Sequence, residues 1–261
     1  MTTPNPVAPA VFFGHGSPMN AIELNRYSKA WREYGASVDK PKAILAISAH
    51  WFTRGTSVTA MPKPRTIHDF GGFPDELYRA KYPAPGDPAL AKRVASTLSD
   101  LPVSLDTHWG LDHGTWSVLV HVFPEADVPV VQLSIDGTKP ASWHWALAER
   151  LAELRRDNVM ILGSGNVTHN FSEIEWGATH EAKWAVGFDR RIWEAVKAGD
   201  KAPLIDYLET PDGRRAAPTA DHYLPVIYAA AARLDGDVVS EITSGIDLGS
   251  FSMRSFELAG A

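Results

Sequence analysis

Residues 159–165 read VMILGSG, a run of apolar side chains that ends in glycine, serine and glycine. An uninterrupted apolar run of this length is typical of a strand whose two faces are both covered, as in a parallel sheet. Two other stretches share the pattern, namely 7–14 (VAPAVFFG) and 42–51 (KAILAISAHW). Together the three stretches predict the centre of a mostly parallel sheet.

Further strands and helices alternate along the chain around this centre. Apolar runs predict strands at 56–61, 103–107 and 129–136, and two closing strands at 238–243 and 251–258. Apolar residues three or four apart predict helices around Leu24, Tyr27, Trp31 and Tyr34, within 142–157, and from Trp184 to Val196. Asp87 before Pro88 predicts the start of a helix that ends near Asp100, and another helix is expected at about 223–234 after a loop at 211–221.

The predicted elements indicate the fold class. No repeat, charge block or linker-like segment divides the chain. The sequence therefore predicts a single α/β domain over residues 1–261, with a mostly parallel, mixed central sheet, helices on both faces and antiparallel strands at the end.

Composition restricts the function. The chain has 25 basic and 31 acidic side chains, a net charge of −6, which argues against a nucleic-acid partner. It contains no cysteine, which excludes disulfides, thiol nucleophiles, iron–sulfur clusters and Cys-ligated zinc. Any bound metal must be held by His, Asp or Glu.

The sequence contains no recognisable signal-peptide core and no recognisable transmembrane segment. The apolar stretch Val11–Phe13 is far shorter than a signal-peptide core of roughly 7–15 residues. No segment reaches the about 18 mostly apolar residues of a transmembrane helix. We therefore expect a cytoplasmic protein with no membrane partner.

Three histidines follow predicted strands. His15 stands between two glycines after the first strand, His50 ends the second, and His169 follows VMILGSG in the turn GNVTHN. In open α/β sheets, ligands bind outside the carboxyl ends of the strands. We therefore expect these three imidazoles to converge on one edge of the sheet, an arrangement that packing alone does not explain.

Two more histidines stand at predicted helix starts. His222 could point back toward the same cleft, with Asp221 as a helix cap or hydrogen-bond partner. His113 follows an aspartate in GLDHGTW, at a turn that leads into a helix. Three of the remaining histidines are expected to be structural, namely His121, His144 and His180. The other two, His68 and His108, are weak candidates for lining a pocket.

Several familiar catalytic patterns are absent from the sequence. HEAKW at His180 lacks the second histidine of a zinc-protease helix, and GSG at 163–165 lacks the spacing of a nucleophile elbow. Neither a dinucleotide-binding nor a P-loop glycine pattern occurs. The chemistry that remains is histidine chemistry, most simply a mononuclear metal with imidazole ligands.

The motifs that carry these histidines resemble the 4,5-DOPA extradiol dioxygenases, which belong to the class III, LigB-type ring-cleaving dioxygenases. The resemblance runs in order through six segments: GHGSPMNAIE (14–23), SAHW (48–51), TIHDFGGFPDELYRAKYPAPGDP (66–88), LDHGTWSVL (111–119), SGNVTHN (164–170) and DHYLP (221–225). It covers nearly the whole chain and implies a single-domain, LigB-like α/β fold with a non-haem metal in a cleft.

The resemblance also implies roles for individual residues. It assigns the metal to His15, His50 and His222, each in its matching motif. It assigns His169 the role of catalytic acid/base or, alternatively, of a fourth metal ligand. It makes His113 a further active-site histidine that interacts with substrate or dioxygen.

The implied reaction opens a catechol such as L-DOPA with O2 and gives a muconic semialdehyde. The wider class commonly completes its iron site with a carboxylate, whereas the branch that this chain resembles uses a histidine, here His222. We expect Fe(II) for turnover, and Zn(II) is plausible as the bound metal because three imidazoles with an open position also suit zinc. Aromatic residues near the motifs could form a slot for the ring: Trp51, Phe70, Phe73, Trp109, Trp116 and Tyr223.

Two other functions stay open at this point. The same histidines could hold zinc that activates water in a hydrolase of esters or amides. The chain could also be a binding protein that keeps the LigB fold without turnover. The presence of all the family histidines favours catalysis over the second alternative.

Overall fold

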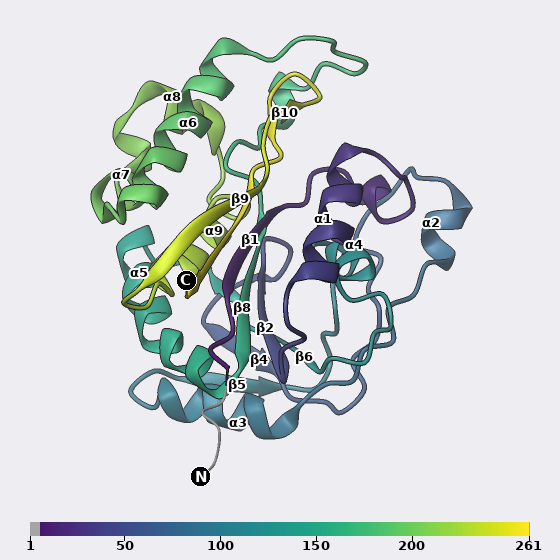
Figure 1. Ribbon diagram of the computed structural model, residues 1–261, viewed down its shortest axis with the longest axis vertical. Helices are drawn as coiled ribbons and strands as arrows, with labels where there is room; N and C mark the ends of the chain where they lie inside the picture. The colour runs from purple at the N-terminus through teal and green to yellow at the C-terminus, as the bar shows by residue number, and fades with distance from the viewer. Residues whose placement is uncertain (1–5, 261) are drawn as a thin grey trace.

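The computed structural model describes residues 6–260 and contains one central sheet of six strands. Their order across the sheet is β6-β2-β8-β1-β12-β9. The bounds are β1 Ala10–Gly14, β2 Ala43–Ser48, β6 Val130–Gln132, β8 Val159–Gly165, β9 Asp237–Thr243 and β12 Ser255–Gly260. The stretch VMILGSG forms β8 over its whole length and lies between β1 and β2 (Figure 1).

The pairing directions explain where a site can form. β8 pairs in parallel with both β1 and β2, and β2 pairs in parallel with β6. β12 runs antiparallel to β1 and β9. The sheet is therefore mixed, and the carboxyl ends of its parallel strands meet at one edge. This confirms the predicted fold class of a single α/β domain with a mixed central sheet.

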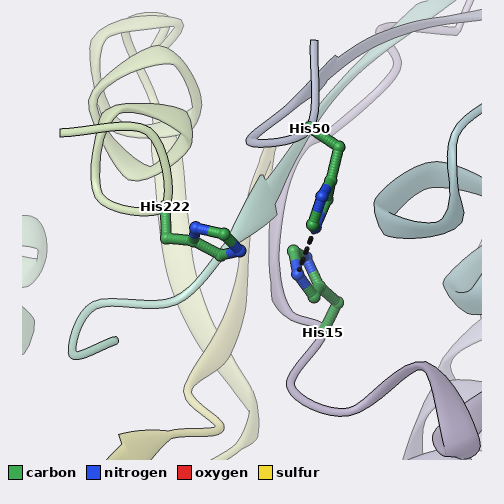
Figure 2. Close-up of side chains that lie close together, drawn as sticks. All are labelled: His15, His50 and His222. Atoms are coloured by element: carbon green, nitrogen blue, oxygen red, sulfur yellow. Dashed lines mark hydrogen bonds between the residues drawn. The ribbon is translucent and has the colours of Figure 1, made fainter. Parts of the chain in front are cut away.

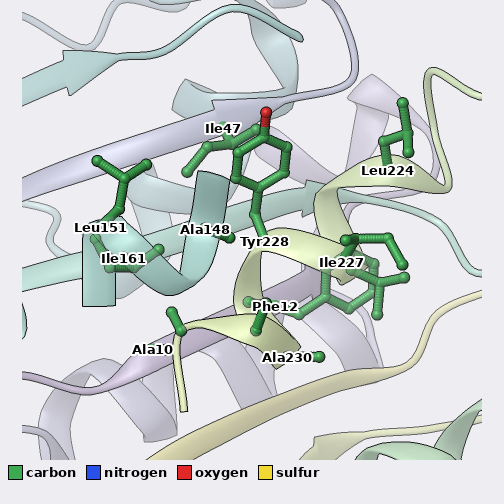
Figure 3. Close-up of a cluster of buried hydrophobic side chains, with 14 of the residues drawn as sticks. Ala10, Phe12, Ile47, Ala148, Leu151, Ile161, Leu224, Ile227, Tyr228 and Ala230 are labelled. Carbon is green, nitrogen blue, oxygen red and sulfur yellow. The ribbon is translucent and has the colours of Figure 1, made fainter. Parts of the chain in front are cut away.

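One face of the sheet packs against helices α5 (Ala141–Leu151) and α9 (Leu224–Ala231). Phe12, Leu45 and Ile161 point to this face, because side chains alternate along a strand. Figure 3 shows Phe12 and Ile161 beside Leu151 of α5 and Ile227 of α9. This packing fixes the start of α9 beside the end of β8.

The opposite face packs against helices α1 (Arg26–Ser37) and α4 (His113–Val122). Val11, Ile44 and Leu162 lie one residue away from the side chains of the first face and join the second core. Figure 1 shows α1 and α4 on one side of the sheet and α5 and α9 on the other. The prediction of helices on both faces is therefore confirmed.

Several predicted strands were too long or belong elsewhere. The stretch 56–61 forms β4 (Thr56–Thr59) and 103–107 forms β5 (Val103–Asp106), and these two pair in a separate two-stranded sheet outside the central one. The stretch 129–136 divides into β6 and β7 (Ile135–Asp136), which pairs with β3 (Phe52–Thr53). The stretch 251–258 divides into β11 (Phe251–Ser252), which pairs with β10 (Ile246–Asp247), and β12.

The helix predictions need three corrections. The expected loop at 211–221 contains helix α8 (Pro211–Ala216), with the Thr210 hydroxyl capping its first turn and proline in that turn. Leu24 lies before α1 and is 58% exposed, so it does not share the buried face of that helix. The helix after Asp87, α3, ends at Thr97, three residues before the expected Asp100.

The remaining helices are short or lie at the periphery. Their bounds are η1 Pro18–Ala21, α2 Asp75–Arg79, α3 Pro88–Thr97, η2 Ala152–Asp157, η3 Phe171–Glu173, α6 Lys183–Ala198, α7 Lys201–Ile205 and η4 Tyr207–Glu209. Within residues 6–260, no helix combines the length and apolarity needed to cross a membrane.

Candidate metal centre

The structure brings the five histidines singled out by sequence into one cleft. His15 follows β1, His50 follows β2 by two residues, His113 opens α4, His169 follows β8, and His222 lies two residues before α9. All five line a cavity of about 650 Å³ at the carboxyl edge of the parallel strands. The expected convergence is therefore present in the fold.

Three of these imidazoles bring ring nitrogens close enough together to share one ion. One ring nitrogen each from His15, His50 and His222 lies within 4.8 Å of the other two. The Nε2 atoms of His15 and His50 are 3.2 Å apart. Figure 2 shows the His222 ring pointing toward the other two from the opposite side.

The tautomer of His15 follows from its hydrogen bonds. The Ser164 hydroxyl donates to the carbonyl of Gly114 at 2.5 Å, because a carbonyl can only accept. The same hydroxyl lies 2.9 Å from His15 Nδ1 and has no second proton to give. His15 must therefore donate from Nδ1, which leaves a lone pair on its Nε2.

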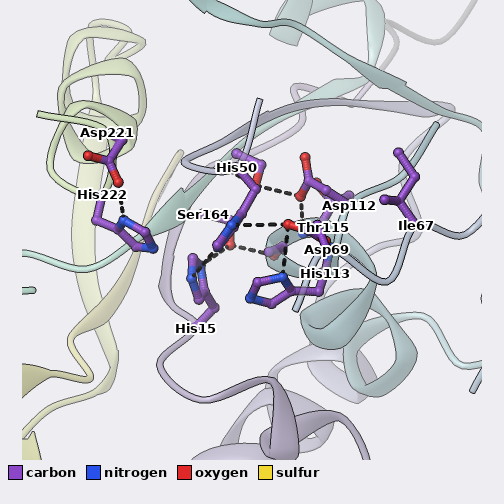
Figure 4. Close-up of polar contacts among 12 residues, drawn as sticks. His15, His50, Ile67, Asp69, Asp112, His113, Thr115, Ser164, Asp221 and His222 are labelled. Atoms are coloured by element: carbon purple, nitrogen blue, oxygen red, sulfur yellow. Dashed lines mark hydrogen bonds and ion pairs between the residues drawn. The ribbon is translucent and has the colours of Figure 1, made fainter. Parts of the chain in front are cut away.

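The other two rings are fixed by carboxylates. His50 Nδ1 lies 3.1 Å from Asp69 Oδ2, and His222 Nδ1 lies 2.5 Å from Asp221 Oδ2 (Figure 4). A carboxylate can only accept, so each Nδ1 carries the proton and each Nε2 keeps its lone pair. The Asp221 contact matches the partner role expected from sequence, although Asp221 does not cap α9, whose first turn has no side-chain cap.

This donor set fits a metal ion. Lone pairs of His15 and His50 facing each other at 3.2 Å repel unless a proton on His50 or a metal ion lies between them. The separation is close to the about 3.3 Å between two nitrogens of a tetrahedral ion with bonds of 2.0–2.1 Å. Burial first, and neighbouring imidazoles second, lower the pKa of both His15 and His222 well below the usual value, so both rings are neutral and ready to bind.

His50 differs from its two neighbours electrostatically. Burial opposes its charged form, but the Asp69 hydrogen bond and the charges of Asp112 and Asp69 outweigh burial and raise the His50 pKa. The pKa of Asp69 is lowered, against its own desolvation, by hydrogen bonds from His113 and His50. Asp69 therefore stays ionised and supplies negative charge beside three imidazole donors that carry none.

Helix α4 presents His113 to the same place. Asp112 caps the helix through Thr115 N at 3.2 Å and accepts from Ser48 and Gln132 at 2.6 and 2.7 Å. His113 Nδ1 lies 3.0 Å from Asp69 Oδ2, and its backbone N donates to Asp69 Oδ1 at 2.9 Å. The Nε2 edge of His113 is thus left for the cleft.

Glycine at 114 permits this close approach of α4. A Cβ there would lie 2.9 Å from His50 Cδ2 and 3.3 Å from His15 Cε1. Any side chain would push the helix away from both rings.

His169 occupies the opposite wall. Its ring stacks on that of His222, with centroids 3.5 Å apart and planes 2° from parallel. Burial lowers its pKa to about 4, so the ring is neutral at neutral pH. Among the described residues, the groups close enough to share one ion are His15–His50–His222 and His50–Asp69–His113, neither of which includes His169.

The aromatic residues near the motifs divide into lining and packing residues. Phe70 and Phe73 line the cleft, as do three residues whose role the sequence did not reveal: Phe171, Trp176 and Phe251. The other expected aromatics lie outside the lining, because Trp51 stacks on Trp109, Tyr223 stacks on Tyr207, and Trp116 is buried in the core.

The remaining histidines lie outside the cleft lining. His121 and His144 are buried, with hydrogen bonds to the Asn20 carbonyl and the Tyr228 hydroxyl. His180 faces Glu175 at the surface. His68 bonds to the Ala80 carbonyl and His108 lies in a loop, so neither weak pocket candidate lines the cleft.

Sequence analysis missed Asp69 and Ser164. Asp69 lies in a segment without regular structure, and Ser164 reads as one more small residue of a buried strand. Two signals pointed to Asp69: it follows His68, a weak pocket candidate, and it lies in segment 66–88, one of the six that carry the family resemblance.

The fold and the three-imidazole cluster define an α/β protein with a donor set for one metal ion at the carboxyl ends of parallel strands. Residues 10–250 match the model of the family described as the catalytic LigB subunit of aromatic ring-opening dioxygenase. The chain belongs to this LigB family and is a non-haem, metal-dependent ring-cleaving dioxygenase, which confirms the resemblance seen in the motifs.

Relatives support this membership along almost the whole chain. The chain is 47% identical to a protein of Escherichia coli K12 named 4,5-DOPA dioxygenase extradiol, covering 96% of this chain and 94% of the relative. It is 38% identical to a protein of the same name from Beta vulgaris, covering 94% of each. A crystal structure of an uncharacterized protein from E. coli K12 superposes with a TM-score of 0.85 at 40% identity, covering 97% of this chain and all of that one.

Proposed function

We propose that the chain, as one catalytic domain over residues 1–261, opens the ring of an L-DOPA-like catechol with O2 and releases a muconic semialdehyde. The observation that carries the proposal is the convergence of three imidazole lone pairs, on His15, His50 and His222, in a cleft with apolar walls. The names of the most similar relatives support a catechol substrate of this kind.

His15, His50 and His222 would hold the metal, which we propose to be Fe(II) in the active enzyme. Bound iron would supply the redox centre and the positive charge that bring a catechol and dioxygen together. A neutral set of three imidazoles also suits Zn(II), so the resting protein can carry zinc.

His169 would act as the acid/base. Its neutral ring has a lone pair that can take a proton from a catechol hydroxyl, and the imidazolium can return that proton later in the reaction. Its face-to-face stacking on His222 supports this role rather than that of a fourth ligand.

His113 would hold the reacting oxygen species or the substrate by hydrogen bonding. Its ring is directed by Asp69 and its backbone by the start of α4, so its free edge needs no reorganisation when substrate arrives. Phe70, Phe73 and Phe251 supply apolar surface for the aromatic ring and exclude water from it.

Anaerobic reconstitution tests the proposal. The protein is loaded with Fe(II), mixed with L-DOPA or another catechol and exposed to O2, while oxygen uptake and a yellow product are followed. We expect uptake by the wild type and a rate lower by about 10²–10⁴ in His169→Ala. Uptake no greater than that of an equally loaded His169→Ala control would contradict the proposal. Mass spectrometry of the product distinguishes cleavage of the 4,5 bond from cleavage of the 2,3 bond.

A further inference from the structure

A second cavity, of about 860 Å³, adjoins the histidine cleft. The two share three lining residues, Ser17, Trp176 and Leu248. Ser17 is two residues from His15, so one shared wall of the two cavities lies close in sequence to the histidine cluster. We call this second cavity the side pocket.

The side pocket carries charges of both signs. Its acidic and basic lining residues are Arg26, His180 and three carboxylates, Glu23, Glu181 and Asp247. His180 faces Glu175, whereas Arg26 and the three carboxylates have no ion-pair partner within 4.0 Å in the part of the chain that the structure describes. The guanidinium of Arg26 bonds to the Tyr27 hydroxyl, so most of its donors are free.

The positions of these charges are set by the backbone. Gly245 has φ of +105°, and a Cβ there would lie 2.7 Å from Arg26 Nη2 and 3.3 Å from Glu181 Oε1. The two side chains thus border one small space that only a glycine keeps open. Glu181 Oε1 also accepts from the backbone N of Ile246 at 2.8 Å, which holds the carboxylate in place.

The start of α1, which carries Arg26, is tied to the metal centre. Asn20 donates to the His15 carbonyl at 2.9 Å, and Asn25 donates to Asn20 at 2.7 Å. Asn25 in turn caps α1 by accepting from Tyr27 N and Ser28 N. The Arg26 backbone is therefore held at a fixed distance from the turn that presents His15.

A guanidinium and carboxylates in one pocket match the two opposite charges of an α-amino acid. Of the three carboxylates, Glu181 borders the same space at Gly245 as Arg26, and Asp247 is two residues from that glycine. Arginine pairs with carboxylates through parallel hydrogen bonds, and carboxylates accept from an ammonium group. We propose that the side pocket binds the α-amino and α-carboxyl groups of a catechol substrate while its ring occupies the histidine cleft. Arg26 receives the carboxylate, and Glu181 with Asp247 receives the ammonium. This assignment rests on the proposed ring-cleaving function and adds to it a preference for catechols with an amino-acid tail.

Four catechols that differ in their charged groups test the carboxylate and the ammonium contacts separately. L-DOPA carries both groups, dopamine lacks the carboxylate, 3-(3,4-dihydroxyphenyl)propionate lacks the ammonium, and 4-methylcatechol lacks both. With the Fe(II)-loaded wild type, we expect kcat/KM to be highest for L-DOPA and lowest for 4-methylcatechol, since each charge-assisted contact contributes about tenfold or more.

Variants then assign each charge to a residue. Arg26→Gln is expected to raise KM about tenfold for L-DOPA and dihydroxyphenylpropionate and to leave dopamine and 4-methylcatechol unchanged. Glu181→Gln combined with Asp247→Asn is expected to raise KM for L-DOPA and dopamine only. Two variants serve as controls: Lys29→Gln, on α1 like Arg26, and Glu194→Gln, on α6. Neither should change the KM for any of the four catechols.

The outcomes are distinguishable. Equal KM changes for all four catechols, or no difference between the variants and their controls, would overturn the side-pocket assignment while ring cleavage stands. If the loaded wild type cleaves no catechol, the proposed function fails, and calorimetry then tests the pocket separately. Air-free binding of L-DOPA to the zinc-loaded protein that is no tighter than binding of 4-methylcatechol would reject the pocket as well.

Discussion

The two walls of the histidine cleft hold their side chains in different ways. We call His50, Asp69 and His113 the α4 wall, and His169, Asp221 and His222 the α9 wall. Figure 4 shows His15 between His222 on one side and His113 on the other. In the α4 wall, Asp69 contacts both imidazoles and a backbone amide at 2.9–3.1 Å. One carboxylate there fixes two rings.

The α9 wall has fewer connections. Asp221 contacts only the His222 ring, and His169 is placed by stacking on His222 and by its backbone bond to Ala216. Beyond it, Phe171 and Trp176 at the mouth of the cleft are 73% and 79% exposed. The contrast indicates that the α4 wall fixes the ligand geometry, whereas the α9 wall leaves the space through which substrate enters.

The largest expected effect comes from His15, the proposed ligand that lies between the walls. In His15→Ala, bound metal falls from about one per chain to near zero and activity falls by more than about a hundredfold. The fold should persist, because the His15 side chain bonds only to Ser164 among its protein partners outside the cluster. Metal content by mass spectrometry and far-UV circular dichroism check both statements. Retention of metal at the wild-type level would remove His15 from the ligand set.

His169 tests whether the α9 wall contributes chemistry rather than metal binding. His169→Ala should lower kcat by about 10²–10⁴ while metal content stays at the wild-type level. The measurements are single-turnover rates and metal analysis on the same preparation. Loss of metal as complete as that of His15→Ala would instead make His169 a fourth ligand.

The different connections of the walls also explain what could be predicted from sequence. His15, His50 and His169 follow buried apolar strands, and parallel strands bring their carboxyl ends together, so their convergence was predictable. Asp69 was not, because it lies in an irregular segment between β4 and α2. No periodicity links such a segment to the strand ends, and only tertiary packing places it between two rings.

The boundaries of helices and strands are likewise predictable from sequence only where local composition determines them. VMILGSG has the predicted bounds because every residue of it is buried in the sheet. Helix α8 was missed because proline and glycine in PDGRRA indicate a turn, whereas the Thr210 cap and the buried Gly213 and Ala216 stabilise a short helix. Local composition is therefore enough to predict a strand at the centre of the sheet, but it is not enough to predict a short peripheral helix.

Asp69→Asn and Asp221→Asn compare the walls directly. Removing an outer partner of a metal-binding histidine typically lowers metal affinity 10–100-fold. We expect Asp69→Asn near the upper end, because it loosens both His50 and His113, and Asp221→Asn near the lower end. Competition titrations of zinc against a chelator measure both. Equal losses would show that the additional contacts of the α4 wall have no effect on the metal.

His144, in the core between α5 and α9, shows what burial does to a histidine outside both walls. Burial lowers its pKa from 6.5 to about 4. The unfolded chain therefore takes up a proton between these values that the folded chain refuses, so stability falls as the pH decreases through this window. Between pH 7.5 and 5 the contribution is about 2 kcal/mol. Urea unfolding of metal-free wild type and His144→Gln at both pH values should show a smaller decrease in the variant, and equal decreases would exclude His144 as a source.

The smallest expected effect compares one aromatic residue from each side of the cleft mouth. Phe70 is half-buried and packs on Phe73, Tyr78 and His113 with ring centroids 5.2–5.4 Å apart. Phe171 is 73% exposed, and its neighbours His169 and Phe251 keep their own contacts without it. Phe70→Ala should cost about 1–2 kcal/mol of unfolding free energy, less than a fully buried phenylalanine, and Phe171→Ala less than about 0.5 kcal/mol. Denaturant titrations decide the comparison: a cost for Phe171→Ala equal to that for Phe70→Ala would mean that both rims of the cleft are equally rigid.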